Sequence, residues 1–468
     1  MKTPCDSKRF SGPLAGSICA LLAFSSLLPL INGAHSYADE AKKQLPRRTA
    51  KAPAVVPSTD ETDKKTAPAR SPEDALATGL KYLLAQQHSD GGWGQGGGWR
   101  QSKGERNAGG RVEGANVEDP SDLGNTCATL VTLLRAGQSP VEGEHHEAAA
   151  KAFDYICRQV ENSDQDSLYV TDVRDTQLQV KIGTYVDTFL AGWALSEVKG
   201  KLADDAAEKR RATALDKVMA KIERNQKDDG SFANNNGWAA VISQGLCSKA
   251  LNSAARSGAK VKQETLDKAQ KQNIAGLDVQ KGGFSAPASP TAEPSSAGVS
   301  LYREAAKLNG LLENSKSNIA RKEAAQKTME NKSATSEAKE QAKKDLQQID
   351  ADDKATAVAN ASVASKLRDS GYVAGFGNNG GEEFLSYMNV TEGVHQRGGQ
   401  EWDDWRSKMT KTVCGAQNAD GSWAGQHCIT GRTFCTSTAL LTLLVEQEKA
   451  DARTSDNKTP TEEPVAKK

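Results

Sequence analysis

The feature that most constrains this 468-residue chain is a recurring turn in which glutamine, glycine and an aromatic residue follow one another at the end of a helical segment. Glycine adopts positive φ at little cost, so it ends a helix and redirects the chain. A weaker copy reaches Phe284 after a longer loop. The clearest copies are Gln86-Gln87 with Trp93, Gln226 with Phe232, and Gln417 with Trp423.

A second, more apolar helix follows each of these turns, and the resulting helix pairs recur about every 50 residues, a spacing typical of repeat arrays. The first helix of a pair is amphipathic, whereas the second is apolar on more of its faces, as an inner helix requires. We therefore predict an all-α protein, an α/α toroid of about six helix pairs over residues 71–450. The predicted inner helices are 123–136, 185–198, 238–255, 297–312, 384–395 and 434–447.

The segments 79–93 and 411–423 resemble the Gln-Trp (QW) repeat of squalene cyclases and protein prenyltransferases, and 215–232 is a further match with Phe in place of Trp. The resemblance spans about residues 72–447, apart from one charged segment. It implies a double-walled toroid and gives the turn residues an architectural role. They are Gln86, Gln87, Trp93, Gln226, Phe232, Phe284, Gln417 and Trp423.

Acidic candidates precede the first inner helix, at Asp119 and Asp122. Squalene cyclases carry an Asp-x-Asp-Asp acid motif at such a position, but here the adjacent acid pair is missing and Pro120 interrupts the pattern. Two interpretations remain. Asp122 is a catalytic acid, which requires burial or a close negative charge, or it only caps the helix that begins at Leu123.

A metal site is the second candidate, formed by His427, Cys428 and Cys435 before and within the last inner helix. Imidazole and thiolate groups are the ligands that zinc prefers. The Asp-x-Cys pair that prenyltransferases use for zinc does not occur in this chain. The alternatives are a disulfide, including one between Cys414 and Cys428, or simple packing.

The ends where the inner helices begin are predicted to surround a cavity of mixed polarity, lined by Asn125, Tyr185, Trp238, Glu383, Arg432 and Thr433. Such a site suits a lipid or isoprenoid, a glycan or a protein segment. Because Lys+Arg and Asp+Glu are both 60, a nucleic-acid partner is not expected. The leading hypothesis is a binding protein without recognisable catalytic motifs. The alternative is an enzyme, either a squalene- or hopene-type cyclase or a glycan-cleaving toroid.

The N-terminus has the pattern of an export signal over residues 1–38, with a basic start, an apolar run and small residues near Ala38. The expected location is therefore the bacterial envelope, either periplasmic or secreted. An uncleaved apolar run would instead anchor the chain in the membrane. Residues 39–70 and 451–468 are polar and lack apolar periodicity, so we expect a disordered linker and tail.

One internal segment, residues 313–353, departs from the pattern of the helix pairs. Lys, Glu, Ala and Gln dominate it, and no apolar stripe runs along it. Its high helix propensity predicts an exposed helical insertion in the fifth pair. The alternative is a disordered charged loop, because propensity alone rarely holds a long solvated helix.

Overall fold

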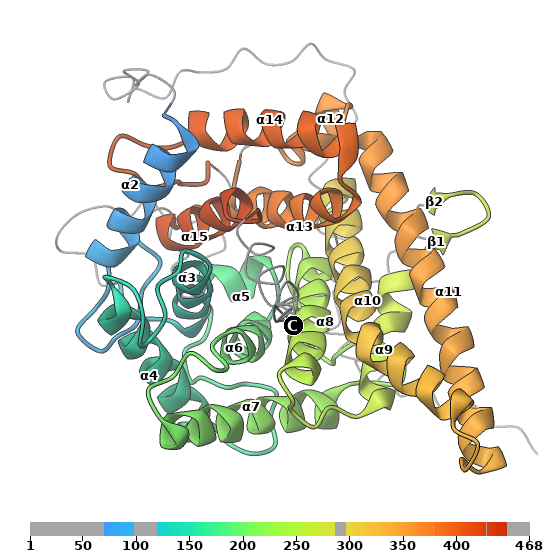
Figure 1. Ribbon diagram of the computed structural model, residues 1–468. Coiled ribbons are helices and arrows are strands. Elements are labelled where there is room, and N and C mark those ends of the chain that lie inside the picture. The colour runs from blue at the N-terminus through green and yellow to red at the C-terminus, as the bar shows by residue number, and fades with distance from the viewer. Residues whose placement is uncertain (1–69, 98–118, 286–295, 378, 427, 447–468) are drawn as a thin grey trace, which may run out of the picture. The chain divides into compact units, whose positions relative to one another are not determined.

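A computed structural model describes residues 70–97, 119–285, 296–377, 379–426 and 428–446 (Figure 1). All of them belong to the unit Asp60–Lys468. Within these ranges the regular secondary structure is almost entirely helical, and the one sheet is a hairpin of β1 (Leu277–Asp278) and β2 (Gly283–Phe284). The predicted export signal, almost all of the linker and the tail lie outside them. No helix in the described ranges combines the length and apolarity needed to cross a bilayer.

Six helices form a closed inner ring, in which each contacts the next and the last contacts the first (Figure 1). In chain order they are α3 (Leu123–Arg135), α6 (Val186–Glu197), α8 (Ala240–Arg256), α10 (Ser300–Glu330), α13 (Gly381–Arg397) and α15 (Arg432–Leu443).

Six further helices form the outer layer, and each packs on an inner helix. They are α2 (Pro72–Ala85), α4 (His146–Asn162), α7 (Asp205–Asn225), α9 (Gln263–Ile274), α11 (Ser336–Lys366) and α14 (Gly399–Gly415). The predicted all-α toroid of six helix pairs is confirmed. Two short helices, α5 (Gln177–Lys181) and α12 (Ser370–Ala374), lie in the connections before α6 and α13.

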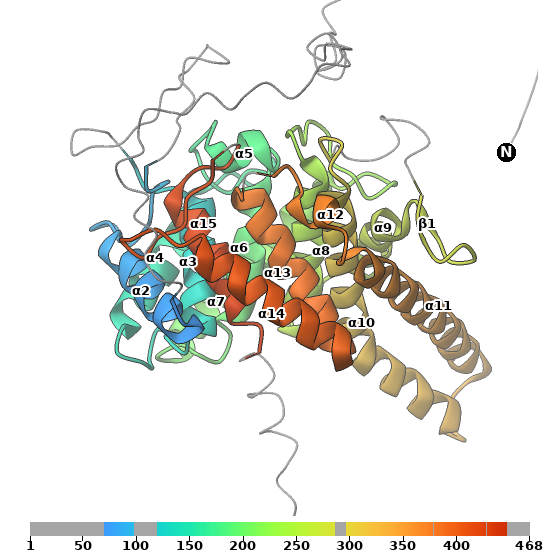
Figure 2. The same cartoon turned by 90° about the horizontal axis from the view of Figure 1, so that it is seen from above.

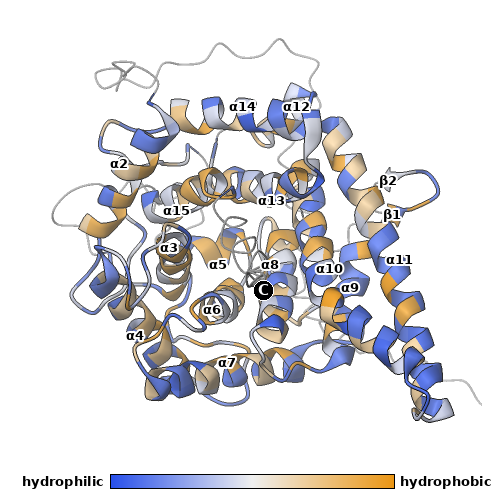
Figure 3. Cartoon of the chain, viewed as in Figure 1, coloured by the Kyte–Doolittle hydropathy of each residue, from blue (hydrophilic) through white to orange (hydrophobic). Residues whose placement is uncertain are grey.

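The two layers differ in how much of each helix is buried. On α4, Phe153, Ile156 and Val160 are buried, whereas Glu147 and Arg158 face solvent. Every residue of α6 from Val186 to Ser196 is buried. Figure 3 shows the same contrast, with apolar colour concentrated on inner helices such as α3 and α6. An inner helix must be apolar nearly all round because it packs on both neighbours in the ring and on an outer helix.

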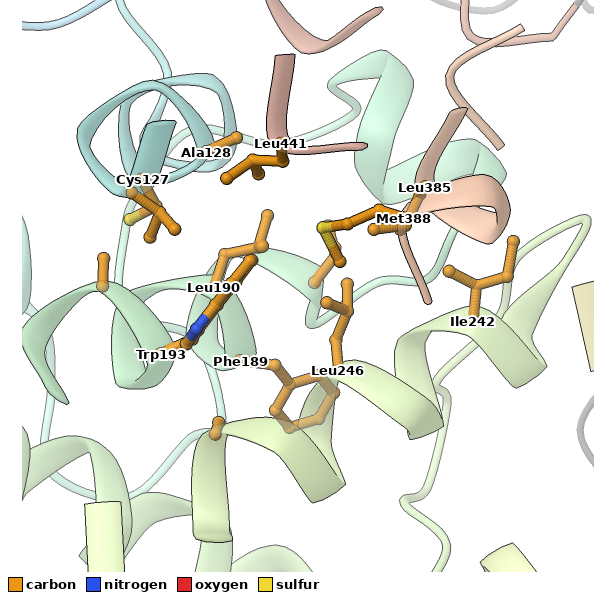
Figure 4. Close-up of a cluster of buried hydrophobic side chains, with 14 of the residues drawn as sticks. Cys127, Ala128, Phe189, Leu190, Trp193, Ile242, Leu246, Leu385, Met388 and Leu441 are labelled. Atoms are coloured by element: carbon orange, nitrogen blue, oxygen red, sulfur yellow. The ribbon is translucent and has the colours of Figure 1, made fainter. Parts of the chain in front are cut away.

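Side chains from the inner helices meet inside the ring (Figure 4). Leu190 and Trp193 of α6 point toward Met388 of α13, and Leu246 of α8 lies beside them. All of these side chains are buried, as are Cys127, Ala128 and Leu441 from the neighbouring helices α3 and α15. The centre of the toroid is therefore a packed apolar core at this level.

The glutamine of each clear turn joins one helix pair to the next. The side-chain amide of Gln87 donates to the carbonyl of Ala148 in α4 at 2.9 Å, and that of Gln226 donates to Thr265 in α9 at 3.3 Å. The amide of Gln417 donates to the carbonyl of Ala75 in α2 at 2.9 Å, which connects the last pair to the first. Gln86 is exposed, so Gln87 makes the joining contact in the first turn.

The aromatic residue of the turn closes back on the helix that precedes it. The indole N–H groups of Trp93 and Trp423 donate to the carbonyls of Leu83 and Val413, each at 2.7 Å. Phe232, which has no such donor, is buried against Phe189 of α6. The fourth aromatic residue, Phe284, lies half-buried in β2.

Glycine is required where these turns approach the next outer helix. Gly421 has φ +90°, and a Cβ there would come within 2.5 Å of the Thr78 carbonyl oxygen in α2. A Cβ at Gly91 or Gly230 would likewise clash with the carbonyl oxygen of Lys151 or Lys268, respectively. A side chain at these positions would separate neighbouring pairs and strain the backbone.

The charged segment is helical, so the alternative of a disordered loop is wrong for residues 313–353. Instead of forming a separate insertion in the fifth pair, it lengthens α10 of the fourth pair and α11 of the fifth. Arg321 pairs with Asp345 across the two helices at 2.5 Å, and Asn314 donates to Asp352 at 3.0 Å. Ala325, Ala342 and Ile349 are buried along the helices. These cross-helix contacts supply the stabilisation that propensity alone does not.

Gln417→Ala should lower the free energy of unfolding by about 1–3 kcal/mol, because it removes amide hydrogen bonds to α2 in a half-buried site. Gln86→Ala is the matched control, since the same substitution at an exposed position should change stability by less than about 0.5 kcal/mol. Urea denaturation followed by circular dichroism measures both. Equal effects from the two variants would contradict the joining role of Gln417.

Candidate functional site

The beginnings of the inner helices lie together at one end of the ring, and we call the loops that enter them the rim. It comprises residues 93–97, 119–122, 173–185, 233–239, 296–299, 375–377 with 379–380, and 428–431. Hydrogen bonds connect neighbouring parts of it: the amide of Gly381 donates to the carbonyl of Ile429, and that of Thr433 donates to Gln95, at 3.0 and 3.1 Å. Tyr302 of α10 donates to Glu383 of α13 at 2.9 Å.

The short helix α5 lies within the outline of the ring in Figure 1 and beyond one end of the inner helices in Figure 2. Its first residue, Gln177, accepts hydrogen bonds from the amides of Thr430 and Gly431 at 3.0 and 3.1 Å. At its other end, the carbonyl of Lys181 accepts from the amide of Ala239, next to the start of α8, at 2.8 Å. The segment from Thr176 to Lys181 thus connects parts of the rim that belong to different helix pairs, and it lies across this end of the ring.

Asp122 is the N-cap of α3 and is buried. One carboxylate oxygen accepts from the amide of Asn125 at 2.8 Å, and the other accepts from the Asn125 side chain at 2.7 Å. Burial, and next the negative charge of Asp187, raises the pKa of Asp122 to about 7. The capping interpretation therefore describes its contacts, and the raised pKa is a property that a Brønsted acid would need.

Asp187, in the first turn of α6, is the partner that sequence reasoning missed. The carboxylates of Asp187 and Asp122 both approach Gly124. Their Oδ1 atoms lie 2.6 and 3.7 Å from the position that a Cβ atom at Gly124 would occupy. Gln179 of α5 donates to the Asp187 carboxylate. Burial raises the pKa of Asp187 to about 6, although the Gln179 hydrogen bond acts in the opposite direction. A lone carboxylate within the apolar stretch 185–195 was the available signal.

Asp119 lies apart from this buried pair. Its two carboxylate oxygens accept from the backbone amides of Gln95 and Gly96, at 2.9 and 2.6 Å. It therefore holds the loop after Trp93 in place. The two acids that the sequence singled out thus have different surroundings, and the structure pairs Asp122 with Asp187 instead.

Glu382 and Glu383 form a second acidic group, where α13 begins. Glu382 accepts from the amide of Ile429 at 3.2 Å, and burial raises its pKa to about 7. Glu383 accepts from Tyr302 and from the amide of Phe376, both at 2.9 Å. Glu383 was predicted to line a cavity. In the structure its carboxylate is buried and bonds to residues at or near the start of the inner helices.

The predicted metal ligands are only partly described, because His427 lies outside the described residues. Cys428 is half-buried with φ +57° and shares a hydrogen bond with Glu382. Cys435 is buried, and its thiol donates to the carbonyl of Ile429 at 3.4 Å. Among the described residues no group of three His, Cys, Asp or Glu side chains has a geometry suited to a metal. All six described cysteines are free thiols, so no bridge joins Cys414 to Cys428.

The remaining predicted cavity residues all lie at the rim, but their settings differ. Asn125 is buried with Asp122, and Thr433 is buried against Gly96. Arg432 is the first residue of α15. Tyr185 and Trp238 are half-buried and belong to a band of aromatic residues that extends along the rim.

Comparisons with known proteins do not assign this chain to a family. No protein-family model and no curated protein matches the chain. Among solved structures, the chain is similar to the apo form of the type II terpene cyclase MstE from Scytonema, at 12% identity and a TM-score of 0.31. The match covers 81% of this chain and 99% of the cyclase chain. A likeness this low carries no inference about activity, and the relationship to the squalene cyclase and prenyltransferase repeat family stays a prediction.

The raised pKa of Asp122 predicts how stability depends on pH. The folded state keeps a proton that the unfolded state loses near pH 4, so stability should fall as pH rises from about 4 through about 7. Asp122→Asn keeps the helix cap but cannot ionise at this position. As pH rises, its free energy of unfolding should therefore increase relative to that of the parent, by about 1.4 kcal/mol for each unit by which folding raises the pKa of Asp122.

Urea unfolding of both proteins at pH 5 and pH 8 measures this effect. Asp204→Asn is the matched control, since Asp204 caps α7 at an exposed position. A stability difference between Asp122→Asn and the parent that is the same at both pH values would contradict the assignment.

Proposed function

We propose that this protein is a noncatalytic binding module that recognises an extended polymer at the rim of its helical toroid. The packed interior of the ring carries this proposal. Side chains such as Leu190, Trp193 and Met388 fill the central space that a toroid enzyme would use to enclose its substrate. The rim, in contrast, presents loops from successive helix pairs side by side.

This proposal replaces the expected ligand inside the toroid with one that lies across its end. A ligand that enters the centre from the rim would have to displace α5, which the hydrogen bonds of Gln177, Gln179 and Lys181 hold in place. A ligand across the rim requires no such change. Pockets for small molecules enclose most of the ligand surface, whereas a series of loops suits a long molecule that contacts several of them.

An acid-initiated cyclase is the second candidate, and one observation favours it. Asp122 has a pKa of about 7, so much of it is protonated at neutral pH and could donate a proton. Its burial beneath α5 opposes this function, because a substrate must come within hydrogen-bonding distance of the acid.

Incubation with squalene, followed by gas chromatography and mass spectrometry, separates the two candidates. We expect no cyclised product from the purified protein, and none from Asp119→Ala or Asp122→Ala. A product that is formed by the parent and lost in Asp122→Ala would establish the cyclase instead.

Envelope polymers are the expected ligands, since the predicted export signal would place the protein among them. Hydrogen–deuterium exchange can locate binding with three probes: a mixture of cello-, xylo- and mannohexaose, a hexagalacturonate, and reduced carboxymethylated lactalbumin as an unfolded polypeptide. At least one probe should slow exchange in 173–185, 233–239 or 375–380, and leave the outer helices unchanged. Protection by none of them, or protection only on the outer helices, would contradict binding at the rim.

A further inference from the structure

We infer that the polymer bound at the rim is a neutral glycan, and that a band of aromatic and amide side chains along three rim loops binds it. This inference rests on the proposed binding function and specifies the chemistry of the ligand. The band comprises Tyr185, Trp238 and Phe376 of the rim and the asparagines of the segment 233–237, together with Tyr169, which lies just outside the rim and contacts Tyr185.

Direct contacts join the aromatic residues into pairs. The rings of Tyr169 and Tyr185 lie 5.0 Å apart between centroids. Trp238 meets Phe376 edge-on at 5.2 Å and Tyr302 at 6.4 Å. Phe376 is 42% exposed, one of the few large apolar side chains in the described chain that face solvent to this extent.

The asparagine segment connects the two aromatic pairs. The hydroxyl of Tyr185 donates to the carbonyl of Ala233 at 3.1 Å, and the amide of Thr184 donates to the carbonyl of Asn236 at 3.0 Å. The same segment leads directly into Trp238. The side chains of Asn234 and Asn236 are exposed between the pairs. The band is therefore continuous from one loop to the next.

The band is uncharged in a chain where charged residues make up 26% of the total. Residues 183–185, 233–239 and 374–381 contain no Asp, Glu, Lys or Arg. Charged groups meet the band at two places: the buried carboxylate of Glu383 accepts from the backbone amide of Phe376 at 2.9 Å, and the guanidinium of Arg174 lies 3.7 Å from the centroid of the Tyr169 ring. Because Glu383 is buried, a strongly anionic or cationic polymer would find no exposed counter-charge within these three stretches.

These side chains match the two kinds of surface on a sugar ring. The electron-rich face of an aromatic ring attracts the weakly positive C–H groups on one face of a pyranose. A primary amide both donates and accepts, so it can bind hydroxyl groups in either sense. Aromatic residues combined with Asn and Gly also provide rigid contact area with adaptable hydrogen bonding.

Backbone conformation gives independent support for a functional role of the rim. Five non-glycine residues in the described ranges have positive φ: Asp175, Asn234, Ala297, Asn379 and Cys428. All of them lie in connections that lead into inner helices, and two of them belong to the uncharged loops. Strained residues of this kind concentrate at binding and catalytic sites.

The test is isothermal titration calorimetry of the full chain with cellohexaose, xylohexaose and mannohexaose. At least one should bind, and Phe376→Ala should weaken that binding at least tenfold, whereas Phe376→Trp should retain it. Ile319→Ala is the matched control, because Ile319 is a large apolar residue with 61% exposure on the α10 extension, away from the rim. It should leave the affinity unchanged.

Other results would overturn the inference in distinguishable ways. Binding that is equally weakened by Ile319→Ala, or unchanged by Phe376→Ala, would place the glycan elsewhere. If the unfolded polypeptide or hexagalacturonate protects the rim from exchange and the neutral hexasaccharides do not bind, the glycan inference fails and the binding function stands. If no probe protects the rim, both fail. Thermal melts of each variant, compared with the parent, would reveal loss of folding.

Discussion

The side-chain amides of the turn glutamines, each bonded to a carbonyl near the start of the next outer helix, determine how the helix pairs assemble. The contacts obey one rule. Gln87, Gln226 and Gln417 bond residues 148, 265 and 75, and the glycine of each turn packs against the carbonyl three residues further along, at 151, 268 and 78. This one geometry joins the first pair to the second, the third to the fourth and the sixth to the first. The last of these contacts, from Gln417 to α2, closes the ring.

Closure has consequences for both the core and the rim. An open array of repeats must cap its ends with polar surface, whereas a ring has no such ends and can make its inner helices apolar nearly all round. The apolar inner faces then fill the centre, as Leu190, Trp193 and Met388 do. What remains accessible at the end of the ring is the set of loops that enter the inner helices. This packing of the centre is why we propose a ligand site at the rim.

Much of the architecture could be predicted from the sequence because it depends on local signals. Helical periodicity, the Gln and Gly of the turns and the apolar inner helices each occupy a few consecutive residues. The helix α5 has no comparable signal. It is five residues long, and the contacts of Gln177 with Thr430 and Gly431, which position it, span 253 and 254 positions in the chain. The order of the charged extension likewise depends on contacts between helices, such as that of Arg321 with Asp345.

The sequence predicts where the candidate residues lie in the fold, but it predicts their chemical surroundings only in part. Asp122 could be recognised as a cap from its position before Leu123, but its burial and its pairing with Asp187 depend on α5 and α6. Residues such as Tyr185, Trp238 and Glu383 do lie at the entrance to the inner helices, as predicted. Their mutual arrangement, and the exposure of Phe376, follow from how loops far apart in sequence pack together.

Native-state hydrogen exchange as a function of denaturant tests the closed ring most directly, because it measures the opening free energy of each helix separately. If the contact from Gln417 to α2 closes the ring, amides in α2 and α15 should exchange with the same opening free energy as those in α6 and α8. If α2 and α15 instead open at a much lower free energy while α6 and α8 stay protected, the helix pairs form an open array, and the account of the toroid is wrong.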